Sequence, residues 1–173
     1  MRQLALAFIG VARLVASVGA KGPTTRIVIT DIERGSVSEI TSRSVLDKFQ
    51  VWAGRGTYSG APDQQNEGTE GFIVDWTAET VEQRPDRLRR YELRFYVASR
   101  NSAAPRLGQG EELAYVVWYE HDAATGRGYV YLPGRSDEHF SLNVRSIHRG
   151  LEGRWLRASH AWQSAFAGLP AAR

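Results

Sequence analysis

One stretch of the chain limits the possible folds more than any other: residues 111–134, EELAYVVWYEHDAATGRGYVYLPG. Leu113 to Tyr119 and Tyr129 to Leu132 are rich in Tyr, Val and Trp, residue types that suit a pleated, partly buried strand. Between them, Asp122 can accept local backbone hydrogen bonds, and Gly126 can take the positive φ angle that a short hairpin loop needs near its end. The stretch therefore predicts a β-hairpin.

The first strand of this hairpin is apolar on both faces. Alternate side chains of a strand point to opposite faces, and here both sets are apolar: Leu113, Tyr115, Val117 and Tyr119 on one face, and Ala114, Val116 and Trp118 on the other. A strand covered on both sides is a central strand of its sheet. Pro133 then ends the second strand, because proline has no N–H to donate. We expect core positions for Trp118, Trp155 and Trp162.

Further strands and two short helices are predicted around the hairpin. Apolar and alternating patterns favour strands over residues 26–32, 37–40, 72–77, 88–98, 140–144 and 153–157. Helical spacing predicts two to three turns through Val45, Leu46, Phe49 and Trp52, and a second helix capped by Ser159 and ended by Gly168. The expected fold is mainly β, on the borderline of α+β: an antiparallel sandwich or open barrel with one or two short helices. Residues 21–173 suffice for a single domain.

The N-terminus has the order of a secretory signal. Met1 and Arg2 precede the apolar run Leu4 to Ala12, and small residues follow up to Ala20. This order predicts a signal peptide over residues 1–20, cut after Ala20, and a periplasmic or secreted protein. Arg13 interrupts the pattern, so an amphipathic N-terminal helix and a wrongly assigned start codon are the alternatives. The run is shorter than the about 20 apolar residues of a membrane-spanning helix, so no membrane span is predicted.

The charge balance gives little support to nucleic-acid binding. The chain carries a net charge of +3, which cleavage after Ala20 would lower to +1 by removing Arg2 and Arg13. Binding to a phosphate backbone needs clustered positive surface. The one dense cluster is interrupted by Pro85, Asp86 and Glu92 and is interpreted as a solvated turn and strand face: Arg84, Arg87, Arg89, Arg90 and Arg94. No nucleic-acid partner is predicted.

Residues 54–71 form a long segment rich in Gly, Gln, Asp and Ser. Loops of this length are uncommon in compact domains unless they are functional or mobile. Aromatic side chains that flank such a loop are common anchors for apolar ligands, sugars and protein partners. We therefore take Trp52, Arg55 and Tyr58 as candidate ligand-binding residues, with core packing as the alternative for the aromatic ones. The predicted partner is an unidentified small molecule or protein.

Candidates for catalysis are sparse. Glu120 and His121 lie at a strand end, and Asp137 and His139 lie on the next loop, so a strand that folds back could bring the four together as an acid/base site. Ordinary polar strand ends and turns are the competing interpretation. The histidines have none of the spacings of a metal site, there is no cysteine, and no Walker, dinucleotide or nucleophile-elbow motif occurs. Neither a metal nor a cofactor is predicted.

Four segments carry a resemblance: SRSVLDKFQVWAG, YEHDAATGRGYVYLPG, RWLRAS and AWQSAF. Together they resemble a set of uncharacterised bacterial proteins with export signals. The resemblance implies a bacterial exported domain and no particular catalysis. The leading hypothesis is an exported, non-enzymatic binding or interaction module of the cell envelope. A hydrolase with an unrecognised site at residues 119–122 and 135–139 is the runner-up, and a cytosolic regulatory partner with an N-terminal docking helix is the third possibility.

Overall fold

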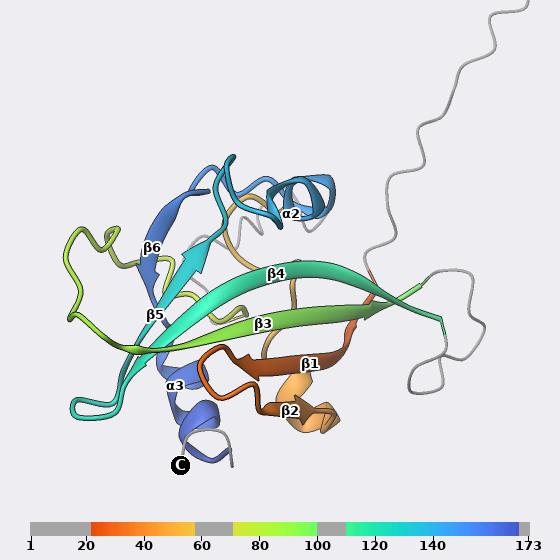
Figure 1. Cartoon of the computed structure of the whole chain (residues 1–173). Coiled ribbons are helices and arrows are strands. Elements are labelled where there is room, and N and C mark those ends of the chain that lie inside the picture. The colour runs from red at the N-terminus through yellow and green to blue at the C-terminus, as the bar shows by residue number, and fades with distance from the viewer. Residues whose placement is uncertain (1–21, 58–70, 100–109, 170–173) are drawn as a thin grey trace, which may run out of the picture.

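The computed structural model describes residues 22–57, 71–99 and 110–169. Within this part of the chain, six strands form one open antiparallel sheet in the order β2-β1-β3-β4-β5-β6 (Figure 1). The strands are β1 (Thr24–Asp31), β2 (Val37–Ile40), β3 (Arg89–Ala98), β4 (Glu111–Asp122), β5 (Arg127–Leu132) and β6 (Arg154–Arg157). The helices are α1 (Arg43–Leu46), α2 (Phe140–Ser146) and α3 (His160–Ala167). The predicted mainly β, antiparallel fold is confirmed, in the form of one open sheet.

The hairpin predicted first is β4 and β5, and β4 lies in the middle of the sheet between β3 and β5. Its turn has the predicted chemistry. Asp122 accepts hydrogen bonds from the backbone N–H of Ala124 at 3.0 Å and from the hydroxyl of Thr125 at 2.6 Å, and Gly126 has a φ angle of 69°. Local residues alone therefore determine this turn.

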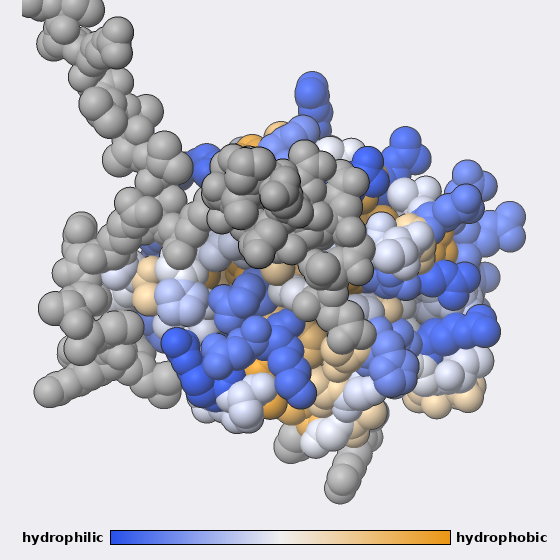
Figure 2. Space-filling view, turned by 180° about the vertical axis from the view of Figure 1, so that it is seen from behind, coloured by the Kyte–Doolittle hydropathy of each residue, from blue (hydrophilic) through white to orange (hydrophobic). Residues whose placement is uncertain are grey.

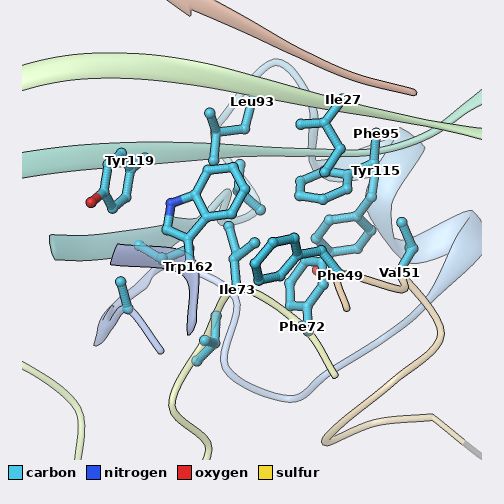
Figure 3. Close-up of a cluster of buried hydrophobic side chains, with 14 of the residues drawn as sticks. Ile27, Phe49, Val51, Phe72, Ile73, Leu93, Phe95, Tyr115, Tyr119 and Trp162 are labelled. Atoms are coloured by element: carbon cyan, nitrogen blue, oxygen red, sulfur yellow. The ribbon is translucent and has the colours of Figure 1, made fainter. Parts of the chain in front are cut away.

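One face of the sheet packs on the hydrophobic core. Side chains from β1, β3 and β4 form one side of this core (Figure 3). Its other side is formed by three parts of the chain: the residues just after α1, the residues just after position 71, and helix α3. Aromatic rings contribute much of this contact: Trp162 lies edge-on to Phe49 at 5.1 Å and to Tyr119 at 5.9 Å between ring centroids. Ser159 caps α3 as predicted, because its hydroxyl accepts the backbone N–H of Trp162. Of the three tryptophans expected in the core, Trp162 lies there.

The opposite face of the sheet, called the outer face below, carries polar and aromatic side chains: Arg90, Glu92, Arg94, Trp118, Glu120, Tyr131 and Trp155. Trp118 and Trp155 are therefore half-buried on the outer face, and the expectation that they belong to the core was wrong. A strand that is apolar on both faces does not reveal which face other elements will cover. Figure 2 shows the side of the molecule that is turned away from the viewer in Figure 1, where hydrophobic patches lie between hydrophilic side chains.

Residues 140–144 form part of helix α2 and not the predicted strand. The helix lies beside β4, where β5 has already ended at Leu132 (Figure 1). There the side chain of Asn143 accepts a hydrogen bond from the backbone N–H of Val116 at 2.8 Å and donates to its carbonyl at 2.6 Å. A side-chain amide thus satisfies the backbone groups that a longer β5 would have paired.

Residues 72–77 also differ from the prediction. Only Val74 pairs in a β-bridge, with Ala158, and the chain then follows the free edge of β6 through the hydrogen bond from Val81 N–H to the carbonyl of Trp155 at 2.8 Å. Phe72, Ile73 and Val74 are all buried, whereas a half-buried strand would bury alternate residues. The apolar run therefore inserts into the core, and the segment protects an edge strand.

Helix α1 is shorter than the two to three turns predicted. It ends after Leu46, and Phe49 and Val51 reach the core from the irregular chain that follows. The side-chain amide of Gln50 donates to the carbonyl of Leu46 at 2.9 Å, so it takes an acceptor that a longer helix would use for the backbone N–H of the same residue. In the described part of the chain, no helix has the length and apolar character needed to cross a membrane.

Candidate functional site

Glu120 is the centre of an ionic cluster on the outer face. It is the third residue from the end of β4, and its side chain is 5% exposed. Arg84 Nε donates to Glu120 Oε2 at 2.5 Å, and Arg90 donates to Oε1 from Nη2 at 2.7 Å and from Nε at 2.9 Å. Arg90 belongs to the neighbouring strand β3, and Arg84 comes from the loop before it. One buried carboxylate is therefore held by two guanidinium groups.

A row of three aromatic rings on the outer face also connects Arg84 and Arg90. Trp118, Tyr131 and Trp155 are neighbours across β4, β5 and β6. Tyr131 lies 5.2 Å from Trp118 and 5.1 Å from Trp155 between ring centroids. Arg90 lies over Trp118 at 5.4 Å and Arg84 over Trp155 at 4.1 Å. These six side chains, called the outer ring, close a circuit in this order: Glu120, Arg84, Trp155, Tyr131, Trp118 and Arg90.

The outer ring fixes which donors of its arginines remain available. In each guanidinium, the edge with Nε and Nη2 faces Glu120 and one flat side lies on a tryptophan. The Nη1 groups of Arg84 and Arg90 have no hydrogen-bond acceptor among the described residues. Their side chains are 31% and 39% exposed. Each arginine can therefore still donate to a ligand.

A cavity of about 270 Å³ lies beside the outer ring, between the β1–β2 turn and the loop before β3. We call it the outer cavity. It is lined by Ile32, Glu33, Arg84, Pro85, Asp86, Arg87, Leu88, Arg90 and Glu120. The hydrogen bond from Ile32 N–H to the carbonyl of Arg90 at 3.0 Å joins these two segments. Arg89 also joins them, because its Nε and Nη2 both donate to Oδ2 of Asp31, at 2.8 and 2.5 Å. The ionic residues of the cavity thus come from three separate segments of the chain, around Glu33, Arg84 to Arg90, and Glu120.

Arg87 on the rim of the outer cavity has a strained backbone. Its φ angle is 60°, and no other non-glycine residue in the described ranges has a positive φ. An L-residue in the left-handed region costs roughly 1–2 kcal/mol, and such residues concentrate at binding sites, where the surrounding structure holds them. The Arg87 side chain is exposed and lines the cavity, and among the described residues it has no ion-pair partner.

The four residues predicted as an acid/base site do not meet. Glu120 binds two arginines on the outer face, whereas His121, the next residue of β4, points to the other face and lies 3.3 Å from the hydroxyl of Tyr119. Asp137 accepts hydrogen bonds from the hydroxyl of Tyr131 and from a backbone N–H, and His139 lies 3.1 Å from Glu92. Among the described residues no hydrogen bond or ion pair joins two of the four. The geometry gives the hydrolase hypothesis no support.

Burial changes the protonation of several groups near these positions. It lowers the pKa of His121, although the carboxylate of Asp122 acts in the opposite direction. It also raises the pKa of Tyr131, and the hydrogen bond to Asp137 adds to that effect. Among the described residues, no group of three or more His, Cys, Asp or Glu side chains is placed to hold a metal ion.

The three predicted ligand-binding residues lie apart from the outer cavity. Trp52 is half-buried, packs on the core and donates from Nε1 to the carbonyl of Gly22 at 2.7 Å. Arg55 is exposed, and its carbonyl accepts a hydrogen bond from Arg149 at 2.9 Å. Tyr58 lies outside the described residues, as does most of the long segment at residues 54–71. A role of these three residues in ligand binding stays a prediction.

Arg149 is a second charged centre, on the core side of the sheet. The residue is 2% exposed, and its guanidinium donates to the carbonyls of Val51, Ala53 and Arg55. It lies 4.3 Å from the ring centroid of Phe72, 5.0 Å from that of Trp76 and 5.2 Å from that of Tyr115. Burial lowers the pKa of Arg149. We call this arrangement the inner cage, and none of the ion pairs among the described residues includes Arg149.

The arginine cluster predicted from the sequence is present, but most of its members are paired with carboxylates and do not form a simply solvated face. Four of its members bind carboxylates: Arg84 and Arg90 bind Glu120, Arg89 binds Asp31, and Arg94 binds Glu92. The sequence does indicate which residues share a face: Arg90, Glu92 and Arg94 lie at alternate positions of one strand, and Trp118 and Glu120 at alternate positions of another. The register that places Arg90 opposite Glu120 cannot be read from either strand alone.

Comparisons of the chain with protein-family models, curated proteins and solved structures find no match. The resemblance to bacterial proteins with export signals therefore stays a prediction from the sequence.

Proposed function

We propose that the chain is an exported, non-enzymatic binding module of a bacterial cell envelope and that the outer cavity is its ligand site. One observation carries the proposal: two arginines fixed by Glu120 have Nη1 donors without an acceptor among the described residues, beside a cavity of about 270 Å³. Preorganised donors at a cavity bind a ligand without first losing side-chain freedom. The strained backbone of Arg87 at the rim supports the same site.

The outer ring is better suited to binding than to acid/base chemistry. A general base needs a lone pair within reach of its substrate. Both carboxylate oxygens of Glu120 already accept hydrogen bonds from guanidinium groups. The ring therefore presents donors to the cavity while its carboxylate is occupied.

A screen of small ligands by thermal shift tests the ligand site, because a bound ligand raises the melting temperature by mass action. The screen would hold amino acids, dipeptides, carboxylic acids, amines and sugars. Ile32→Trp fills the outer cavity without changing its charge, and Val37→Trp is the matched control. Ile32 and Val37 are large hydrophobic residues of the β1–β2 hairpin that are 52% and 59% exposed, and only Ile32 lines the cavity. We expect a ligand that stabilises the wild type and Val37→Trp but not Ile32→Trp. A screen without any such ligand would refute the proposed site.

Export has its own test. Expression of the full chain with a C-terminal tag, followed by fractionation and N-terminal sequencing, should yield a periplasmic or secreted product that begins at Lys21. An uncleaved cytosolic product would refute export and leave the ligand site unaffected.

A further inference from the structure

The lining of the outer cavity combines both signs of charge with apolar surface. Its cationic residues are Arg84, Arg87 and Arg90, its acidic residues are Glu33, Asp86 and Glu120, and its apolar residues are Ile32, Pro85 and Leu88. Glu33 and Asp86 are exposed, and neither has an ion-pair partner among the described residues.

The balance of these charges selects among ligands. Glu120 neutralises one of its two arginines, so the outer ring keeps one excess positive charge at the cavity, and Arg87 adds another. Glu33 and Asp86 supply two negative charges without a partner in the described part of the chain. A ligand with a single charge meets lining groups of its own sign as well as of the opposite sign, and the like charges repel it. A ligand that carries one charge of each sign can place each charge beside a group of the opposite sign.

The volume of the outer cavity and its apolar lining further limit the class of ligand that it can bind. A cavity of about 270 Å³ lies just below the range of roughly 300–1,000 Å³ found for drug-sized ligands, so it suits a smaller molecule. The side chains of Ile32 and Leu88 offer apolar contact beside the ionic groups.

We propose that the outer cavity binds an α-amino acid with an apolar side chain, either free or as a short peptide. The ligand carboxylate accepts hydrogen bonds from Arg87 and from Nη1 of Arg84 and Arg90, and guanidinium groups suit a carboxylate because they can donate two parallel hydrogen bonds. Its ammonium group lies against Glu33 and Asp86, and its side chain packs on the apolar wall. This inference rests on the proposed function, since it assigns a ligand class to the same site.

The first test compares four probes by calorimetric titration of the full mature chain. L-leucine carries both charges, L-leucinamide lacks the carboxylate, N-acetyl-L-leucine lacks the ammonium group, and glycine lacks the apolar side chain. We expect L-leucine to bind at least about tenfold more tightly than each of the other three, which corresponds to 1.4 kcal/mol. Equal or tighter binding of either singly charged derivative would overturn the inference.

The second test removes the residues proposed to bind each charge of the ligand and measures the effect on each probe. Arg87→Gln should weaken binding of L-leucine several-fold but leave the weak binding of L-leucinamide unchanged, because that probe has no carboxylate to lose. Glu33→Gln combined with Asp86→Asn should weaken L-leucine several-fold and leave N-acetyl-L-leucine unchanged or improved. If both variants weaken all probes equally, the residues do not recognise the two charges separately and the inference is wrong.

The outcomes separate this inference from the proposed function. A sugar, an amine or a simple acid that binds the wild type and not Ile32→Trp would keep the outer cavity as the ligand site and overturn the amino-acid class. Failure of every probe and every screened ligand would overturn both. Binding of L-leucine that survives in Ile32→Trp would place its site elsewhere and overturn the inference.

Discussion

The inner cage and the outer ring both hold charged side chains among aromatic rings, and they differ in what completes the coordination. Arg149 in the inner cage is 2% exposed and donates to three backbone carbonyls. The arginines of the outer ring share a carboxylate, remain 31% and 39% exposed, and keep Nη1 donors beside a cavity. Burial of a charged group is therefore not by itself a sign of a ligand site. Unused donors at a cavity are the more specific sign.

This difference suggests separate tasks for the two centres. The inner cage joins the chain after α1, the segment after residue 71 and the chain before β6, because Arg149 contacts all of them. The outer ring joins β3, β4, β5 and β6 on the other face of the sheet. The first centre is expected to contribute mainly to stability and the second to both stability and binding.

Removal of Arg149 should have the largest effect. Arg149→Met keeps much of the apolar volume but leaves the carbonyls of Val51, Ala53 and Arg55 without this donor. Each buried group that loses its partner costs about 1–3 kcal/mol, so we expect the free energy of unfolding to fall by about 3–5 kcal/mol in urea titrations. Arg154→Met, at an exposed position of β6, is the control and should change it by less than about 0.5 kcal/mol. A loss below about 1 kcal/mol for Arg149→Met would contradict a structural role for the cage.

Loss of the carboxylate at the outer ring should cost less. Glu120→Gln leaves Arg84 and Arg90 close together without a negative charge between them, but their partial exposure lets water solvate both. We expect the free energy of unfolding to fall by about 1–3 kcal/mol. Glu138→Gln, at an exposed position without an ion pair among the described residues, is the control. If Glu120→Gln destabilised the protein more than Arg149→Met, the assignment of tasks to the two centres would have to be reversed.

Arg87→Gly should change stability and binding in opposite directions. Glycine adopts a φ angle of 60° without the strain of an L-residue, so the free energy of unfolding should rise by up to about 1 kcal/mol after the greater chain entropy of glycine is subtracted. Ligand binding should weaken, because the guanidinium is gone. Arg87→Asn separates the two effects, since asparagine tolerates this backbone region but lacks the charge. A variant that is both less stable and equally able to bind would contradict the role given to Arg87.

The smallest expected effect is a dependence of the free energy of unfolding on pH, caused by His121 on the core side of the sheet. Burial lowers the pKa of His121 in the folded state below its usual value of 6.5, so between these two pKa values the unfolded chain binds more protons than the folded one. The contribution of His121 to stability is therefore fully present above pH 6.5 and declines as the pH falls from 6.5 through the folded pKa. His121→Phe should lack this part of the pH profile in urea titrations. An identical profile in the wild type and the variant would exclude His121 as its source.

The sequence predicted the elements whose signals are local. The Asp122 and Gly126 turn, the strands on either side of it and the Ser159 cap all depend on residues within a few positions of one another. Helix α2 was missed because its position depends on Asn143 reaching Val116, a residue of another strand. The sequence predicts a strand over residues 72–77, because a short apolar run such as Phe72 to Val74 is typical of a strand in a buried sheet; in the structure all three residues of this run insert into the core.

The candidate site was harder to predict for the same reason. The outer ring depends on the register of four strands and on Arg84, which comes from a loop. Tyr-Glu-His-Asp at residues 119–122 suggested catalysis, but alternation along β4 sends Glu120 and His121 to opposite faces. Of the four predicted acid/base residues, Glu120 is the one that lines the outer cavity. Composition and motifs identified the right residue types but could not show which of them meet.

We expect the outer arginines to donate to a ligand and the buried guanidinium of Arg149 in the inner cage to remain out of its reach. Nuclear magnetic resonance of the arginine guanidinium groups, recorded with and without L-leucine, measures this for each arginine separately. We expect the signals of Arg84, Arg87 and Arg90 to shift and to exchange more slowly with solvent when the ligand is added, while the signals of Arg149 do not change. Unchanged signals at the three outer arginines, or an equal change at Arg149, would contradict this expectation.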